Sequence, residues 1–242
     1  DDAGAQAPEA IAAARRVAEK VLARLGMPFD IDSRVHRSGS SIGVSLLGAD
    51  TRTVEEALKR ADVAMYQAKS AGRNTVRFFD PAMQAAVEAR AALEVDLRDS
   101  LGHGALTLHF QPQVGPDDHV LGAEALLRWT HLVRGPVSPA EFIPVAEQSG
   151  LIIELGEWVL QQACAQLAQW ATQPHTADLT LAVNVSVNQF RQADFADKVR
   201  QALVHHGAAP TRLKLEITES MFAYDQETII NKMREIKSLG VG

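Results

Sequence analysis

Apolar and polar residues alternate with a period of two along four stretches in the second half of the chain. These stretches are 105–114, 119–129, 179–187 and 211–218, and such alternation predicts β-strands with one apolar and one polar face. Longer segments with helical periodicity separate the last three stretches. This order predicts an α/β fold in which strand–helix units build a parallel sheet or barrel.

The first part of the chain has a different order of elements. Residues 8–25 and 54–70 have helical periodicity, and short strand-like stretches occupy 28–35, 40–47 and 74–79. Helices that alternate in this way with paired short strands predict the end of an α+β domain. In the first helix the apolar residues at helical spacing are Ile11, Ala14, Val17, Val21 and Leu25.

A third helix is predicted between these two parts, over residues 80–100. Asp80 is expected as its N-cap and Pro81 lies in its first turn, where proline is tolerated. The segment has few bulky apolar residues, so we interpret it as a linker helix and not as a core element. The predicted division of the chain is therefore 1–79, 80–100 and 101–242.

Polar side chains share one face on each of the predicted strands. An antiparallel sheet with one solvated face would show the same pattern and would need no function. The intervening helices instead suggest a sheet covered on its outer side, so that the polar face points into a barrel or crevice. Among the residues on this face are Gln111, Glu124, Leu126, Arg128, Asn184 and Glu216.

Two carboxylates and an amide would converge on that face, at Glu124, Glu216 and Asn184. Unpaired carboxylates repel one another and are costly to desolvate, and a divalent cation resolves both problems. Oxygen ligands without cysteine or paired histidine suit Mg²⁺, Mn²⁺ or Ca²⁺ better than Zn²⁺. Arg128 lies roughly 13 Å from Glu124 along the strand, at about 3.3 Å per residue. It is therefore expected to hold a phosphate beside the cation.

Composition limits the class of protein. Of the 242 residues, 46% are hydrophobic and the net charge is −6, so no basic field is available to bind a DNA or RNA duplex. A single cysteine, Cys164, fits a reducing compartment. The sequence contains no long apolar run and no signal peptide, which predicts a cytoplasmic location unless upstream segments anchor the protein.

The ordered motifs EALLRW, SPAEFIPVAEQSGLI, VNVS and LEITES closely resemble those of the EAL domain, a cyclic-di-GMP phosphodiesterase. The resemblance covers residue 101 to the end. It implies a modified TIM barrel, incomplete here, that uses two Mg²⁺ or Mn²⁺ ions to hydrolyse cyclic di-GMP to linear pGpG. The stretches SSIGVSLL and ADVAMYQAKSAGRNTVRFFD resemble the C-terminal half of a GGDEF domain, a diguanylate cyclase.

The resemblance also implies roles for single residues. Glu124, Asn184 and Glu216 match metal ligands of the EAL family, and Arg128 matches its phosphate-binding arginine. Gln111 and Leu126 are expected to contact the substrate. Glu219 matches a glutamate that positions the loop carrying further metal-binding aspartates.

In the GGDEF-like part, Lys69 and Arg73 match residues that contact the nucleotide triphosphate, which would make GTP a ligand. A solvated basic turn, favoured by the helix dipole, is the simpler interpretation of these two residues. A homodimer is compatible with this resemblance.

The match to both families is partial. No GG(D/E)EF motif occurs in the chain, and EIKSLGVG ends where the EAL family continues into its DDFGTG stretch. We therefore expect a piece of a longer protein that does not turn over cyclic di-GMP by itself. For the intact protein, the leading hypothesis is a phosphodiesterase. The alternatives are a non-catalytic cyclic-di-GMP receptor and a cyclase that acts through the GGDEF part.

Overall fold

A computed structural model describes residues 3–32, 34–47, 53–217 and 226–242. The chain forms two compact units, Asp1–Ala91 and Ala92–Gly242, and each is described by itself. Among the described residues, no helix has both the length and the apolar character needed to cross a membrane.

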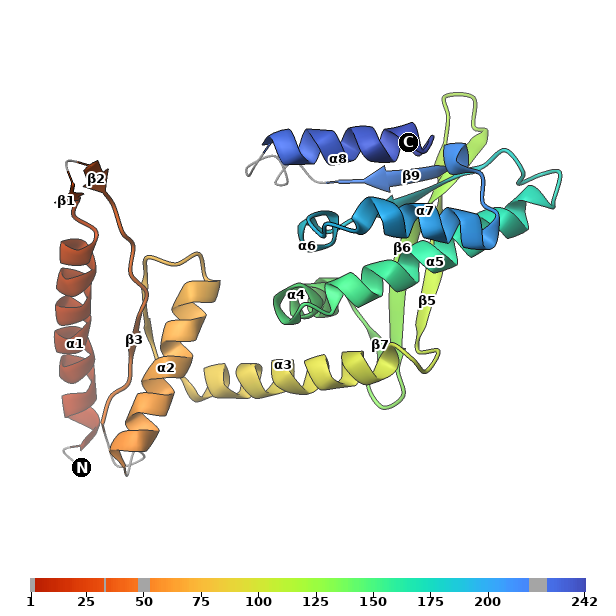
Figure 1. The fold of residues 1–242 in the computed structure, drawn as a ribbon. Coiled ribbons are helices and arrows are strands. Elements are labelled where there is room, and N and C mark those ends of the chain that lie inside the picture. The colour runs from red at the N-terminus through yellow and green to blue at the C-terminus, as the bar shows by residue number, and fades with distance from the viewer. Residues whose placement is uncertain (1–2, 33, 48–52, 218–225) are drawn as a thin grey trace. The chain divides into compact units, whose positions relative to one another are not determined.

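The first unit contains short strands between two longer helices (Figure 1). The predicted order of elements is confirmed, although the stretch 28–35 contains the larger part of a hairpin of two strands instead of a single strand. Strands β3 and β4 pair in parallel. The elements are α1 (Ala3–Leu25), β1 (Phe29–Ile31), β2 (Arg34–His36), β3 (Ile42–Val44), α2 (Val54–Ser70) and β4 (Val76–Phe78).

Helix α2 lies directly on β3 because Gly43 has no side chain. A Cβ atom at Gly43 would lie 2.0 Å from the carbonyl oxygen of Ala61 and 2.3 Å from the amide nitrogen of Met65. Such contacts are far below van der Waals separation, so only glycine permits this packing. At the start of α2, the amide of Glu56 donates to the Thr53 hydroxyl at 3.1 Å, which caps the helix.

The apolar residues of α1 mostly face solvent. Val17 is 63% exposed and Leu25 is 50% exposed, whereas the neighbouring Ala18 is buried at 6%. The helix therefore exists where its periodicity predicted it, but it presents a small alanine to the unit's interior. The bulky residues find no covering layer among the described residues.

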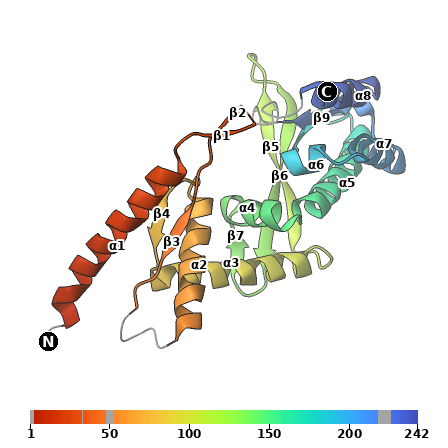
Figure 2. The ribbon, with the colours of Figure 1, turned by 60° about the vertical axis from the view of Figure 1, so that its left-hand side comes forward.

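The second unit is a sheet with helices packed on it. The strand order is β5-β6-β8-β9, and β7 pairs with β6. Strands β5 and β6 are antiparallel and form a long hairpin (Figure 2), whereas β6, β8 and β9 are parallel. The strands are β5 (Leu106–Val114), β6 (Val120–His131), β7 (Gly135–Val137), β8 (Thr180–Asn184) and β9 (Leu213–Glu216).

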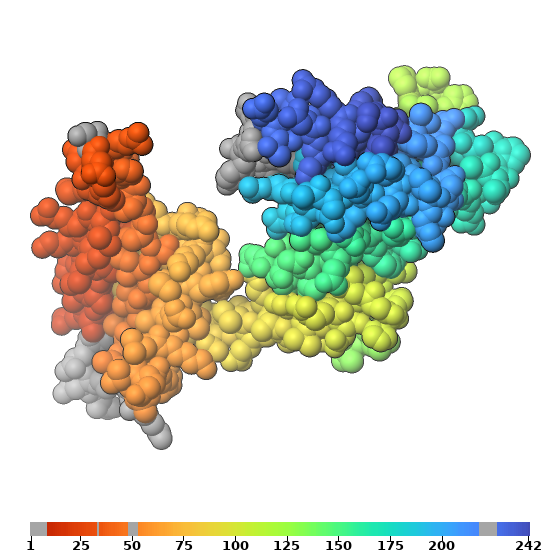
Figure 3. Space-filling view, viewed as in Figure 1, coloured from red at the N-terminus to blue at the C-terminus, as the bar shows by residue number. Residues whose placement is uncertain are grey.

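Helices connect the parallel strands, as the sequence predicted. Helix α5 lies beside α7, and Figure 3 shows α5, α7 and α8 stacked side by side on one face of this unit. Their apolar sides and the inner faces of β8 and β9 form a core that includes Leu160, Leu181, Val199 and Leu213. The helices are α4 (Pro139–Ser149), α5 (Ile152–Ala171), α6 (Val187–Phe190), α7 (Phe195–His206) and α8 (Gln226–Ser238).

The third helix, α3 (Pro81–Ser100), differs from the sequence interpretation in one respect. Its first turn is as predicted, with the amide of Ala82 donating to the Asp80 carboxylate at 2.8 Å. Its last turns, however, belong to a core, because Leu93 and Leu97 are buried. The Trp129 indole also donates to the Ser100 hydroxyl at 2.9 Å. The expectation that this helix has no core role was therefore wrong for its C-terminal half, where a few well-placed leucines suffice.

Candidate functional site

The parallel strands place two of the predicted ligand side chains in contact. Glu124 in β6 stands opposite Ala182 in β8, and Asn184 lies two residues further along β8 on the same face. The Asn184 side-chain amide donates to Oε1 of Glu124 at 2.7 Å. Residues 60 positions apart in the sequence thus meet at the polar face of the sheet.

Glu216 and Gln111 flank this pair in register. Glu216 in β9 stands opposite Asn184, and Gln111 in β5 stands opposite Glu124. All four residues therefore occupy one region of four adjacent strands. Glu124 is half-buried, whereas the other three are exposed, so the oxygen atoms remain accessible to solvent and to a ligand.

The predicted ligands among these four, Glu124, Asn184 and Glu216, are two carboxylates and one amide. Within the described ranges, no group of three or more His, Cys, Asp or Glu side chains is placed to hold a metal ion. A cation at this place would consequently need the amide oxygen of Asn184 in addition to Glu124 and Glu216. An all-oxygen set of this kind fits a hard divalent cation.

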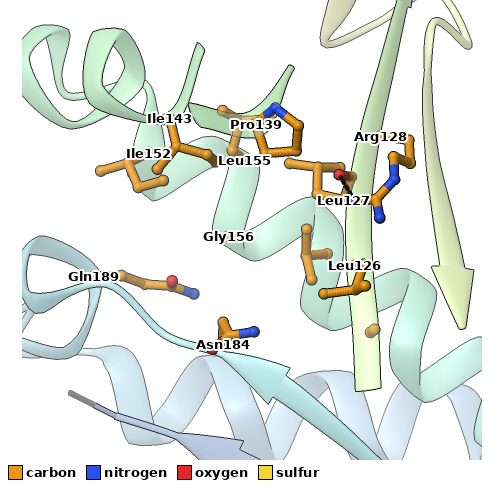
Figure 4. A pocket seen from close by; sticks show the side chains of 12 residues that line it. Leu126, Leu127, Arg128, Pro139, Ile143, Ile152, Leu155, Gly156, Asn184 and Gln189 are labelled. Atoms are coloured by element: carbon orange, nitrogen blue, oxygen red, sulfur yellow. Dashed lines mark hydrogen bonds between the residues drawn. The ribbon is translucent and has the colours of Figure 1, made fainter. Parts of the chain in front are cut away.

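A cavity of about 230 Å³ opens beside Asn184, where β6 continues beyond the end of β8 (Figure 4). Its walls are mainly apolar and come from β6, α4 and α5, including Leu127, Ile143 and Leu155. Leu126 and Arg128 also line it. A predominantly apolar cavity with a few polar groups is typical of a small-molecule site.

Arg128 is half-buried at the wall of this cavity. Its guanidinium donates one hydrogen bond, from Nη1 to the carbonyl oxygen of Leu127 at 2.9 Å. A guanidinium has five N–H donors, so others remain for an anionic ligand. The structure therefore leaves Arg128 able to bind a phosphate.

Among the cavity residues that the sequence analysis did not name are Gln189 and Gly156. Gln189 on α6 is only 5% exposed, and Figure 4 shows its side chain directed into the cavity, as is that of Asn184. Gly156 in α5 makes room for it, because a Cβ atom there would lie 2.3 Å from the Gln189 amide. The signal was a glycine inside a helix of strong apolar periodicity, where glycine costs about 1 kcal/mol relative to alanine.

The remaining predicted residues lie elsewhere. Glu219 lies outside the described residues. Lys69 is in the last turn of α2 and is exposed. Arg73, also exposed, has a left-handed backbone with φ of 61°. Both belong to the first unit, whereas the site on the sheet belongs to the second.

Comparisons with known proteins identify the family of the chain. Residues 94–242 match the family model described as the EAL domain, and residues 5–75 match that of the diguanylate cyclase, GGDEF domain. The chain therefore belongs to the EAL domain family and carries GGDEF-family sequence before it. This membership confirms the predicted fold class, an α/β EAL-type fold preceded by part of a GGDEF domain.

The chain is also similar in sequence to individual proteins of known name. It is 41% identical over 230 residues to the bifunctional diguanylate cyclase/cyclic di-GMP phosphodiesterase MucR of Pseudomonas aeruginosa, covering 95% of this chain and 33% of MucR. It is 32% identical over 227 residues to the cyclic di-GMP phosphodiesterase PdeR of Escherichia coli, covering 93% of this chain and 34% of PdeR. The chain thus spans about a third of the length of these curated relatives.

Solved structures show the same likeness. The PaMucR phosphodiesterase in complex with c-di-GMP is 43% identical, with a TM-score of 0.60 over 62% of this chain and 61% of that chain. The EAL enzyme Bd1971, in a form bound to cAMP and cyclic di-GMP, is 26% identical with a TM-score of 0.62, over 80% of this chain and 51% of that chain.

Proposed function

We propose that the protein containing this chain hydrolyses cyclic di-GMP to linear pGpG. The observation that carries the proposal is the contact between Glu124 and Asn184, with Glu216 in register beside them. A receptor that only binds the nucleotide needs no such set of oxygen ligands. The names of MucR and PdeR support the same activity.

A divalent cation fits the residues present. Glu124, Asn184 and Glu216 would hold Mg²⁺ or Mn²⁺, because hard cations prefer carboxylate and amide oxygens. The hydrogen bond from Asn184 to Glu124 fixes the carboxylate and leaves the amide oxygen free to act as a ligand. When bound, such a cation supplies Lewis-acid stabilisation of charge on a phosphodiester.

The protein's own residues would bind and orient the substrate. Arg128 would donate to a phosphate oxygen, and charge-assisted hydrogen bonds of this type are stronger than neutral ones. Leu126 and the apolar walls of the cavity would take up a planar base, and Gln189 would hydrogen-bond to the edge of that base. Gln111 would contact the substrate from β5. Holding the dinucleotide at several points keeps its phosphodiester next to the cation ligands.

The test compares variants of the full-length protein. Wild type, Glu124→Gln and Glu154→Gln are incubated with cyclic di-GMP and Mn²⁺ or Mg²⁺, and pGpG is measured by chromatography. Glu124→Gln preserves the shape of the side chain but removes its charge, so the rate should fall at least about a hundredfold, as expected when metal binding is impaired. Glu154 is an exposed helix residue, and its variant should keep the wild-type rate.

Two results would contradict the proposal. Wild-type protein that binds cyclic di-GMP without producing pGpG would favour a receptor. Hydrolysis that survives in EDTA, or in Glu124→Gln, would exclude the assigned cation site. Glu219 lies outside the described residues, and its positioning role is part of the same proposal.

The GGDEF part adds a further expectation. Binding of GTP near Lys69 and Arg73, and self-association of the protein, follow from the family resemblance. The division into 1–79, 80–100 and 101–242 also belongs to this proposal. A titration of the full-length protein with GTP, with Lys69→Ala and Arg73→Ala as variants, tests the nucleotide contact.

A further inference from the structure

Lys232 on α8 connects two segments that lie far apart in the sequence. Its ammonium group donates to the carbonyl oxygen of Phe190 at 2.8 Å and to that of Gln192 at 2.6 Å. These carbonyls belong to the end of α6 and the turn that follows it. A helix end leaves carbonyl groups without partners inside the helix, and a lysine satisfies them well.

The surroundings of Lys232 strengthen this contact. The ammonium group is partly buried and lies 5.7 Å from the centre of the Phe190 ring. Burial lowers the pKa of Lys232, whereas the charges of Glu235 and Asp194 act in the opposite direction. Because a partly buried charge loses solvation, it depends on the two carbonyl groups for compensation.

The segment held by Lys232 is the one that carries Gln189. Helix α6 has only four residues, too few to be stable by itself. At its start the Ser186 hydroxyl accepts a hydrogen bond from the backbone N–H of Gln189 at 3.1 Å. At its end Lys232 holds the Phe190 carbonyl. The short helix is thus fixed on both sides of the residue whose side chain enters the cavity.

We propose that Lys232 is a positioning residue that sets the affinity for the dinucleotide by holding Gln189 in the cavity. The proposal rests on the proposed function, in which Gln189 contacts the ligand. Lys232 does not line the cavity itself, so it acts through α6. Since Gln189 would contact a part of the ligand remote from the scissile bond, its loss should weaken binding of ground state and transition state equally.

The experiment is a double-mutant cycle in the full-length protein. Variants Lys232→Met, Gln189→Ala and their combination are compared in the hydrolysis of cyclic di-GMP, and kcat and KM are measured for each. Lys232→Arg preserves the charge, and Lys237→Met serves as a matched control because Lys237 is an exposed lysine on the same helix. Thermal unfolding of every variant reports whether the fold is intact.

For Lys232→Met we expect a KM about tenfold higher, since charged hydrogen bonds to the turn are lost, with kcat within about twofold of wild type. Lys232→Arg should restore most of the affinity, and Lys237→Met should match wild type. In the Gln189→Ala background, Lys232→Met should add little, because residues that act through one contact are not additive.

Other results overturn the proposal. If the two single effects simply add, Lys232 does not act through Gln189. If kcat falls while KM stays unchanged, Lys232 supports the cation ligands instead. If wild type neither hydrolyses nor binds cyclic di-GMP, the proposed function fails. If wild type is active and Lys232→Met is unaffected, the positioning role of Lys232 is refuted, whereas the proposed function stands.

Discussion

Helices α1 and α5 have similar lengths and similar apolar periodicity, yet they bury very different surfaces. In α5, seven residues are buried, among them Leu155, Leu160 and Leu167. In α1, Val17 is 63% exposed and Val21 43% exposed, whereas Ala18 is buried. Periodicity thus determines that a helix forms, but a second layer is needed to bury its apolar side.

The cause of this difference lies in what surrounds each helix. Helix α5 packs against β8 on one side and against α4, α6 and α7 on others. Helix α1 contacts the short strands β3 and β4. Hydrophobic burial contributes roughly 25 cal/mol per Å² of apolar area removed from water. We therefore expect substitutions in the second unit to cost far more stability than equivalent ones in the first.

The largest expected difference concerns two leucines. Leu97 is fully buried in the second unit, whereas Leu58 in the first is 65% exposed. Leu97→Ala should lower the free energy of unfolding by about 2–5 kcal/mol because it leaves a cavity. Leu58→Ala should change it by less than about 0.5 kcal/mol. Urea denaturation measures both changes.

Tryptophan fluorescence reports the unfolding of the second unit specifically. The three tryptophans of the chain, Trp129, Trp158 and Trp170, all belong to it, so their fluorescence reports its unfolding. Trp129 belongs to the same core cluster as Leu97. Equal destabilisation by the two alanine variants, each followed in its own unit by hydrogen exchange, would refute the comparison.

A smaller effect is expected where the first unit does pack closely. Gly43→Ala places a methyl group against the backbone of α2, and overpacking of this kind costs about 1–3 kcal/mol. Amide hydrogen exchange of α2 should accelerate. Gly102→Ala is the matched control, because a Cβ atom there meets nothing within 4 Å. If α2 exchanges equally in both variants, the close contact at Gly43 does not stabilise the unit.

The extent to which sequence predicted these features depends on the range of the interactions. The alternation in EALLRW and VNVS placed Glu124 and Asn184 on polar faces, and parallel pairing then brought them together. The glycine inside α5 signals a close approach at Gly156, but its partner Gln189 was not predictable, since that contact depends on packing between α5 and α6, which are separated in the sequence by β8. The contact of Lys232 with Phe190 of α6 likewise spans 42 residues, and no local pattern reports it.

The last prediction perturbs the protein least and concerns Cys164, which lies on the buried face of α5 and is fully buried. Burial raises the pKa of the Cys164 thiol to about 11. Since only the thiolate reacts, modification by a thiol reagent at pH 8 should be about a hundredfold slower than for an exposed cysteine. The rate should rise with pH until the pH approaches that pKa, and it should become fast in urea.

A Val17→Cys, Cys164→Ala variant provides the contrast, because position 17 is 63% exposed. Its thiol should react at once in native protein. Rapid modification of native Cys164 would mean that the core of the second unit opens readily, and the contrast between the two units would then disappear.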